Sequence, residues 1–120
     1  MQTQTLYIFG PFRLNRVERT LLRDDKIVAL TPKAFDTLCQ LVINNGHLLK
    51  KEELMELVWT DTIVEESNLN VIIHTLRKAL GDDPRESKYI ETVAKRGFRF
   101  VAKVRTETEN EPPNEQITGE

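Results

Sequence analysis

The stretch EESNLNVIIHTLRKALGDDPRESKYIETVAKRGFRF, residues 65–100, decides the fold. Its first half places four apolar residues on one side of a helical wheel, as in a helix that buries one stripe. The stripe consists of Leu69, Ile73, Leu76 and Leu80. Gly81 favours a left-handed stop, and Pro84 cannot continue a helix. The pattern therefore predicts a helix over about residues 65–80.

The opposite side of this predicted helix is not purely polar. It carries Ser67, Val71, His74, Thr75 and Lys78, with Asn68 and Ile72 at its flank. Val71 is unusual there, because a β-branched apolar residue gains nothing from packing on a solvated face and is a modest helix former. A thymine methyl group in the DNA major groove is met by an apolar contact of this kind. Asn68, His74 and Thr75 can exchange hydrogen bonds with base edges.

Two strand-like runs follow the helix, at residues 89–93 and 98–101. The turn between them, residues 94–97, contains Lys95 and Arg96. A core-packed helix followed by a cationic hairpin is typical of a winged helix that binds DNA, with the hairpin at the adjacent minor groove or at phosphates. The alternative interpretation of Lys95 and Arg96 is an ordinary basic turn.

The residues before this stretch predict a small antiparallel sheet and two helices. The expected strands are residues 6–9, 12–14, 20–23 and 26–30, separated by turn residues such as Gly10-Pro11 and Asp24-Asp25. Thr31 is a good cap for a first helix that ends near Asn45-Gly46. A second helix is expected from about Lys51 to Trp59, and residues 60–64 connect it to the third. The order of elements predicts an α+β fold.

The net charge of −2 hides a strong segregation of charge along the chain. Residues 106–120 carry five glutamates and no base, and they contain Pro-Pro without apolar periodicity, so we expect a disordered acidic linker there. Residues 51–66 have a net charge of −5, whereas residues 74–105 have a net charge of +5. The basic segment is the surface expected to meet phosphate.

The composition excludes several other classes of protein. The 120 residues, 39% of them hydrophobic, suit one globular domain. Cys39 is the single cysteine and is expected in the core, and no apolar run reaches the roughly 20 residues needed to span a bilayer. A cytoplasmic location follows as the default. The sequence shows no metal-ligand cluster, no phosphate-binding glycine loop and no nucleophile with a base, so neither an enzyme nor a cofactor is predicted.

Several motifs in order resemble one family. They are Leu30-Thr31-Pro32-Lys33-Ala34-Phe35, Asn45-Gly46, residues 54–59, residues 64–69, Leu76-Arg77-Lys78-Ala79-Leu80, Ile90-Glu91-Thr92-Val93 and Gly97-Phe98-Arg99-Phe100. Over about residues 5–105 the chain resembles the OmpR/PhoB-type winged-helix DNA-binding domain of bacterial transcription regulators. The resemblance implies an N-terminal four-stranded antiparallel sheet, three helices and a C-terminal β-hairpin wing, within a domain of residues 1–105.

The resemblance also implies roles for individual residues. Contacts to bases fall on Val71, Ile72 and Thr75, to which Asn68 is added from its place on the helix. Contacts to the DNA backbone fall on Trp59, Ser67, Asn68, His74, Arg77, Thr92 and Phe98, with Lys78, Lys95 and Arg96 added for their charge, and a further wing contact falls on Ala94. Many relatives carry arginines where this chain has Ser67, His74, Thr75 and Ala94, so its groove contacts should be fewer and more apolar. Trp59 as a core residue and Lys78 as a solvated cation remain open alternatives.

The resemblance finally implies partners. They are double-stranded DNA with direct-repeat sites, a weak head-to-tail dimer on DNA, and RNA polymerase at the loop of Thr60, Asp61, Thr62 and Ile63. Because the chain begins almost directly in the predicted sheet, we expect a sensor or effector domain after residue 120, either soluble or tethered through a membrane helix. The alternative function is a winged helix that binds another protein, which the apolar pair Val71-Ile72 favours.

Overall fold

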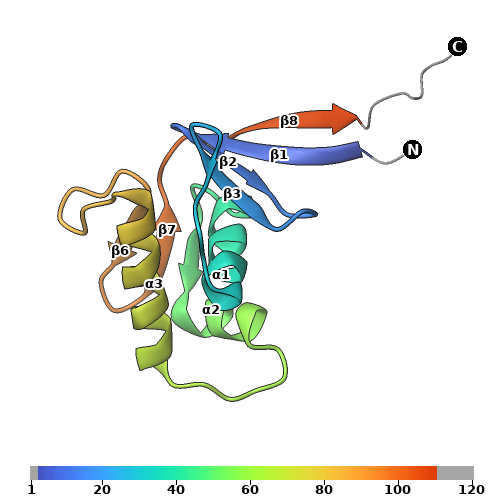
Figure 1. Cartoon of the computed structure of the whole chain (residues 1–120). Helices are drawn as coiled ribbons and strands as arrows, with labels where there is room; N and C mark the ends of the chain where they lie inside the picture. The colour runs from blue at the N-terminus through green and yellow to red at the C-terminus, as the bar shows by residue number, and fades with distance from the viewer. Residues whose placement is uncertain (1–2, 111–120) are drawn as a thin grey trace, which may run out of the picture. The chain divides into compact units, whose positions relative to one another are not determined.

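The structure, a computed structural model, describes residues 3–110. Within that range the chain divides into two compact units (Figure 1). The strand unit joins residues 3–28 to residues 104–110, and the helical unit is residues 29–103. The predicted recognition helix and hairpin both belong to the helical unit.

The strand unit is a five-stranded antiparallel sheet in the order β4-β3-β2-β1-β8. Its strands are β1 (Thr3–Phe9), β2 (Phe12–Asn15), β3 (Thr20–Arg23), β4 (Lys26–Ile27) and β8 (Arg105–Asn110). Asp24 and Asp25 both have positive φ, as a two-residue hairpin turn that follows the strand twist requires. The four predicted N-terminal strands are confirmed, although β4 is shorter than residues 26–30.

Strand β8 corrects the start of the predicted disordered linker, because residues 106–110 belong to it, and it adds a fifth strand to the four predicted N-terminal ones. It pairs antiparallel with β1, from Ile8 opposite Arg105 to Thr3 opposite Asn110. Backbone hydrogen bonds hold an edge strand without apolar periodicity, and a polar strand therefore gives no hydrophobic signal in the sequence. Residues 111–120, the rest of the predicted linker, lie outside the described residues.

The helical unit contains α1 (Pro32–Ile43), α2 (Lys51–Val58) and α3 (Glu66–Leu80), each close to its predicted bounds. The Thr31 hydroxyl accepts a hydrogen bond from the backbone N–H of Ala34 at 3.3 Å, as the predicted cap requires. At the start of α2 the Glu53 carboxylate accepts from the backbone N–H of Lys50 at 2.8 Å. This bond holds the first turn although a lysine side chain cannot cap a helix.

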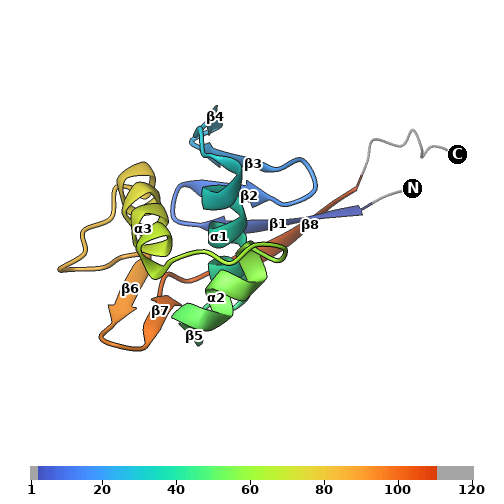
Figure 2. The ribbon, with the colours of Figure 1, turned by 90° about the horizontal axis from the view of Figure 1, so that it is seen from below.

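A second antiparallel sheet, in the order β5-β7-β6, belongs to the same unit (Figure 2). Strands β6 (Ile90–Val93) and β7 (Gly97–Phe100) form the predicted hairpin wing. The third strand, β5 (Leu48–Lys50), was not predicted, because three residues are too few to show an alternating pattern.

The predicted apolar stripe of α3 lies in the core of the helical unit. Leu69, Ile73, Leu76 and Leu80 are each at most 2% exposed, and α1 packs against both α2 and α3. Cys39 on α1 is also buried, as predicted. A fully buried aliphatic side chain is worth roughly 1.5–3 kcal/mol, so four of them fix which side of α3 faces solvent.

Candidate nucleic-acid interface

The outer side of α3 carries the residues that the sequence predicts there. Ser67, Asn68, Val71, His74 and Lys78 are exposed, while Ile72 and Thr75 are half-buried. Val71 is 62% exposed although it is apolar and lies in the middle of the helix. Because neither Val71 nor Thr75 is in the core, α3 has the orientation that a DNA-reading helix needs.

Arg77 links α3 to the wing, a role that sequence patterns did not indicate. Its Nη2 donates to the backbone carbonyl of Ile90 at 2.9 Å and to the hydroxyl oxygen of Thr92 at 2.7 Å. Burial lowers the pKa of Arg77 from its ordinary value, and the negative charge of Asp82 opposes that shift. The predicted backbone contacts Arg77 and Thr92 are therefore bonded to each other within the unit.

Asp82 organises the loop between α3 and the wing. Its carboxylate accepts backbone N–H groups of Lys88 at 2.7 Å, Tyr89 at 3.3 Å and Ile90 at 2.8 Å. Gly81 ends α3 in the left-handed conformation with φ 71°, as predicted. A carboxylate directly after a helix-ending glycine is the one sequence signal that could have identified this role.

The wing tip, residues 94–96, is exposed and basic. The N–H of Arg96 donates to the carbonyl of Val93 at 3.0 Å and closes the turn, in which Lys95 has φ 66°. The carbonyl of Arg96 accepts from the N–H of Lys51 at 3.1 Å, so the tip is tied to the start of α2. Both cationic side chains of the wing tip face solvent, as a phosphate contact requires.

Phe98 is a correction to the predicted phosphate contacts. Its side chain is only 4% exposed and cannot offer its ring to a phosphate group. It lies on the central strand β7, opposite Leu49 on β5 and Thr92 on β6, where a strand paired on both sides contributes to the core. At the neighbouring Gly97 an added Cβ would lie 2.0 Å from the carbonyl oxygen of Leu49, so the two strands approach closely there.

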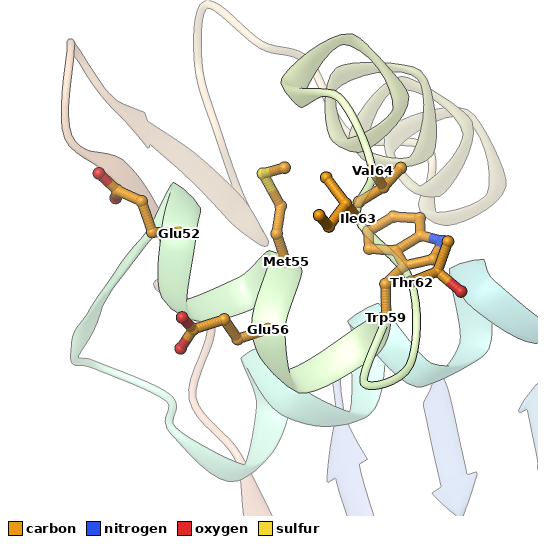
Figure 3. A pocket seen from close by; sticks show the side chains of 7 residues that line it. All are labelled: Glu52, Met55, Glu56, Trp59, Thr62, Ile63 and Val64. Atoms are coloured by element: carbon orange, nitrogen blue, oxygen red, sulfur yellow. The ribbon is translucent and has the colours of Figure 1, made fainter.

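Trp59 lies directly after α2, beside the loop that leads to α3 (Figure 3). It is half-buried, and the ammonium nitrogen of Lys33 is 6.0 Å from its ring centroid. It lines a cavity of about 260 Å³ together with Glu52, Met55, Glu56, Thr62, Ile63 and Val64. Figure 3 shows Ile63 and Val64 beside the indole ring. The tryptophan is thus neither a core residue nor fully free for a phosphate.

The loop predicted to contact polymerase is accessible. Thr60, Asp61, Thr62 and Ile63 are all exposed, and the Ile63 side chain is fully so. The contact itself stays a prediction.

Three helices followed by a β-hairpin, with a mixed surface on the third helix, define a winged helix-turn-helix protein. Residues 24–100 match the family described as "Transcriptional regulatory protein, C terminal". The chain belongs to this family, the OmpR/PhoB-type DNA-binding domains of bacterial transcription regulators. The resemblance seen in the sequence is confirmed, and the family is one of DNA-binding domains and not a class of enzymes.

Individual relatives agree with this assignment. The transcriptional regulator HilA of Salmonella typhimurium is 37% identical over 94 residues, which are 78% of this chain and 17% of HilA. The DNA-binding domain of E. coli CadC superposes with a TM-score of 0.74 at 28% identity, over 87% of this chain and 98% of that domain. The DNA-binding domain of Klebsiella pneumoniae RstA, solved in complex with the RstA box, superposes with a TM-score of 0.71 at 28% identity. The match covers 80% of this chain and 96% of the RstA chain. The chain spans about a sixth of the length of HilA.

Proposed function

We propose that the helical unit binds double-stranded DNA sequence-specifically, as the DNA-reading module of a transcriptional regulator. Helix α3 would enter the major groove, which is about 12 Å wide and accepts a helix with its side chains. The wing tip would reach the adjacent minor groove or its phosphates. The observation that carries the proposal is the exposed, mixed face of α3 opposite a fully buried apolar stripe.

The proposed contacts follow from exposure and chemistry. Base edges are assigned to Asn68, Val71, Ile72 and Thr75. The DNA backbone is assigned to Trp59, Ser67, His74, Lys78, Thr92, Lys95 and Arg96, with Arg77 acting through the wing that it holds in place. The segregation of charge supports this choice of surface, because the net charge of +5 lies in residues 74–105, which include the second half of α3 and the wing.

The wider setting is also a proposal. We propose binding to direct-repeat sites as a weak head-to-tail dimer, contact with RNA polymerase through residues 60–63, and a sensor or effector domain further along the full chain. A cytoplasmic location of this module goes with DNA binding. None of the helices within residues 3–110 is both long and apolar enough to cross a membrane.

Fluorescence anisotropy with a labelled random-sequence duplex tests the function. If four to six phosphates are neutralised per chain, log affinity should fall against log salt with a slope of roughly −4 to −5. The double variant Lys95→Gln/Arg96→Gln should flatten that slope by up to about two, if each side chain neutralises one phosphate. No binding of the duplex, or a slope of log affinity against log salt near zero, would exclude DNA binding. Either result would favour a winged helix that binds another protein.

A further inference from the structure

Resting on the proposed DNA-binding function, we infer that α3 reads A·T base pairs, with Val71 against the 5-methyl group of a thymine and Asn68 on an adenine. The inference goes beyond DNA binding, because it names the base pairs that the helix selects. It follows from the side chains that α3 exposes to solvent and from the hydrogen bonds that hold its one arginine, Arg77, against the wing.

Val71 offers an apolar contact at the centre of that face. It is 62% exposed, and its neighbours one turn away on the same side are the polar residues Ser67 and Thr75. In the major groove the thymine methyl is the apolar group that a base pair presents, whereas guanine and cytosine present only hydrogen-bonding groups. A branched aliphatic side chain in this position therefore favours thymine over either.

The arginine of α3 is not free to contact guanine. Arginine or lysine bidentate to O6 and N7 of guanine is the commonest specific contact to a base. Lys78, the one lysine of α3, is in the last turn of the helix, whereas the N-terminal part of a recognition helix contacts the base edges. Arg77 is the one arginine in the sequence of α3, and its Nη2 is bonded to the carbonyl of Ile90 and the hydroxyl of Thr92. Releasing it would leave a carbonyl of β6 without this partner, so its guanidinium is committed to the wing.

Asn68 supplies the complementary contact to adenine. It lies one turn before Val71, is exposed, and its carboxamide makes no hydrogen bond to another part of residues 3–110. A free carboxamide can bond to N6 and N7 of adenine with its oxygen and its nitrogen together. Residues one turn apart on a recognition helix face the same few base pairs, so the two side chains jointly select A·T.

Base analogues test this directly. A duplex is first selected from a random pool with the protein, and each thymine is then replaced singly by uracil, which lacks only the 5-methyl group. At one or two positions the affinity should fall about fourfold, the loss expected for one buried methyl. For Val71→Ala the thymine and uracil duplexes should bind within about 1.5-fold of each other, since the two γ-methyl groups that would reach the thymine methyl are removed.

Two controls separate this contact from general effects. Val17→Ala makes the same change at a residue of matched exposure, 64%, outside α3, and should keep the full uracil sensitivity. Replacing the same T·A pair by 5-methylcytosine·guanine keeps the methyl and removes the adenine. Wild type should lose affinity on this change, whereas Asn68→Ala should not.

The outcomes distinguish the inference from the function on which it rests. If every uracil duplex binds like its thymine parent, or if the selected site has no thymine whose replacement matters, the A·T assignment is wrong. Duplex binding with a steep salt dependence would still stand in that case. If no duplex is selected and the salt response is flat, the proposed function fails and the inference fails with it.

Discussion

Arg77 lies at the junction between α3 and the wing, and its hydrogen bonds hold the two elements together. Two hydrogen bonds from Nη2 fasten the wing strand β6 to the helix, and burial of the guanidinium lowers its pKa. A hydrogen bond to a charged group contributes about 1.5–3 kcal/mol, somewhat less where water can enter. The wing is thus held at a defined position beside α3.

Replacing Arg77 by alanine should therefore loosen the wing. We expect the free energy of unfolding to fall by roughly 1.5–3 kcal/mol in urea titrations, because the carbonyl of Ile90 loses its donor. Affinity for DNA should fall by the same factor for selected and random duplexes. Thr92→Val removes one acceptor alone and should cause a smaller loss of stability. A change in sequence preference with unaltered stability would show that Arg77 reads bases instead.

Gly97 is required for a steric reason, whereas Gly46 is required for a conformational one. A methyl group at Gly97 would lie 2.0 Å from the carbonyl oxygen of Leu49, but one at Gly46 would meet nothing within 4 Å. Gly46 has φ 82°, where a residue with a side chain is strained. The two glycines therefore form a matched pair for one substitution.

Gly97→Ala should destabilise the protein more than Gly46→Ala does. The first change must separate β5 from β7 and should cost about 3 kcal/mol or more, beyond ordinary overpacking. The second should cost about 1–2 kcal/mol for a left-handed backbone. Urea unfolding followed by circular dichroism measures both, and equal losses would mean that the β5–β7 approach is looser than the structure has it.

At the scale of elements, the wing turn combines strain with charge. Lys95 has φ 66°, which costs a residue with a side chain about 1–2 kcal/mol relative to glycine. A lysine at this position is therefore unfavourable for the fold and favourable for contact with phosphate. The effect of Lys95 on folding stability can be separated from its effect on DNA affinity, because the first is unfavourable and the second favourable.

Lys95→Gly should make the protein more stable and weaken its binding to DNA. Removing the strain should raise the free energy of unfolding by up to about 1 kcal/mol, because the larger backbone entropy that glycine loses on folding offsets part of the gain. Removing one charge should reduce the salt slope by about 0.9. The neighbouring variant Arg96→Gln should lower affinity in the same way without any gain in stability. If Lys95→Gly leaves the salt slope unchanged, Lys95 does not touch phosphate.

Edge strand β8 depends on its backbone alone, since the described side chains from Arg105 to Thr108 are exposed. Residues of an antiparallel strand alternate between those bonded to the partner strand and those whose N–H points away, and β8 has a partner on one side only. Thr106 and Glu107, adjacent residues opposite Tyr7 and Leu6, therefore differ in what their N–H groups do.

Of the variants Thr106→Pro and Glu107→Pro, one should be damaging and the other nearly neutral. Proline removes a hydrogen bond to β1 at one position, at a cost of roughly 1–2 kcal/mol, but at the other it removes an N–H that faces solvent. Urea unfolding with amide exchange of β1 distinguishes them. Two equally tolerated prolines would mean that β8 does not hold the edge of β1 in solution.

Elements with many side chains in a core were predictable, and elements held by the backbone were not. The extent and orientation of α3 follow from the spacing of its apolar residues, because only one orientation of the helix buries all of them. These residues are Leu69, Ile73, Leu76 and Leu80. Strands β5 and β8 carry no such pattern, being respectively short and polar. In the candidate site, exposure of Val71 followed from helical periodicity, whereas the bonds of Arg77 and the burial of Phe98 depend on partners distant in sequence.

At the scale of the whole molecule, acidic and basic residues are concentrated in different segments of the chain, which the net charge of −2 does not show. Glu52 and Glu56 are exposed on α2 and line the cavity beside Trp59, but neither glutamate is itself a proposed phosphate contact. Glu53 differs, because its carboxylate is bonded to the N–H of Lys50. Because neither carboxylate is a proposed DNA contact, we expect the two free glutamates to repel DNA through the long-range field.

Glu52→Gln/Glu56→Gln should bind DNA more tightly at low salt and equally well at physiological salt. The Debye length is about 30 Å at 0.01 M and about 8 Å at 0.15 M, so a charge remote from the duplex acts only in the first condition. We expect a two- to threefold gain at 10 mM that disappears by 150 mM, measured by anisotropy with one duplex, while the melting temperature confirms an intact fold. A gain that persists at 150 mM would place the two carboxylates within about 8 Å of the phosphates and would contradict a purely long-range repulsion.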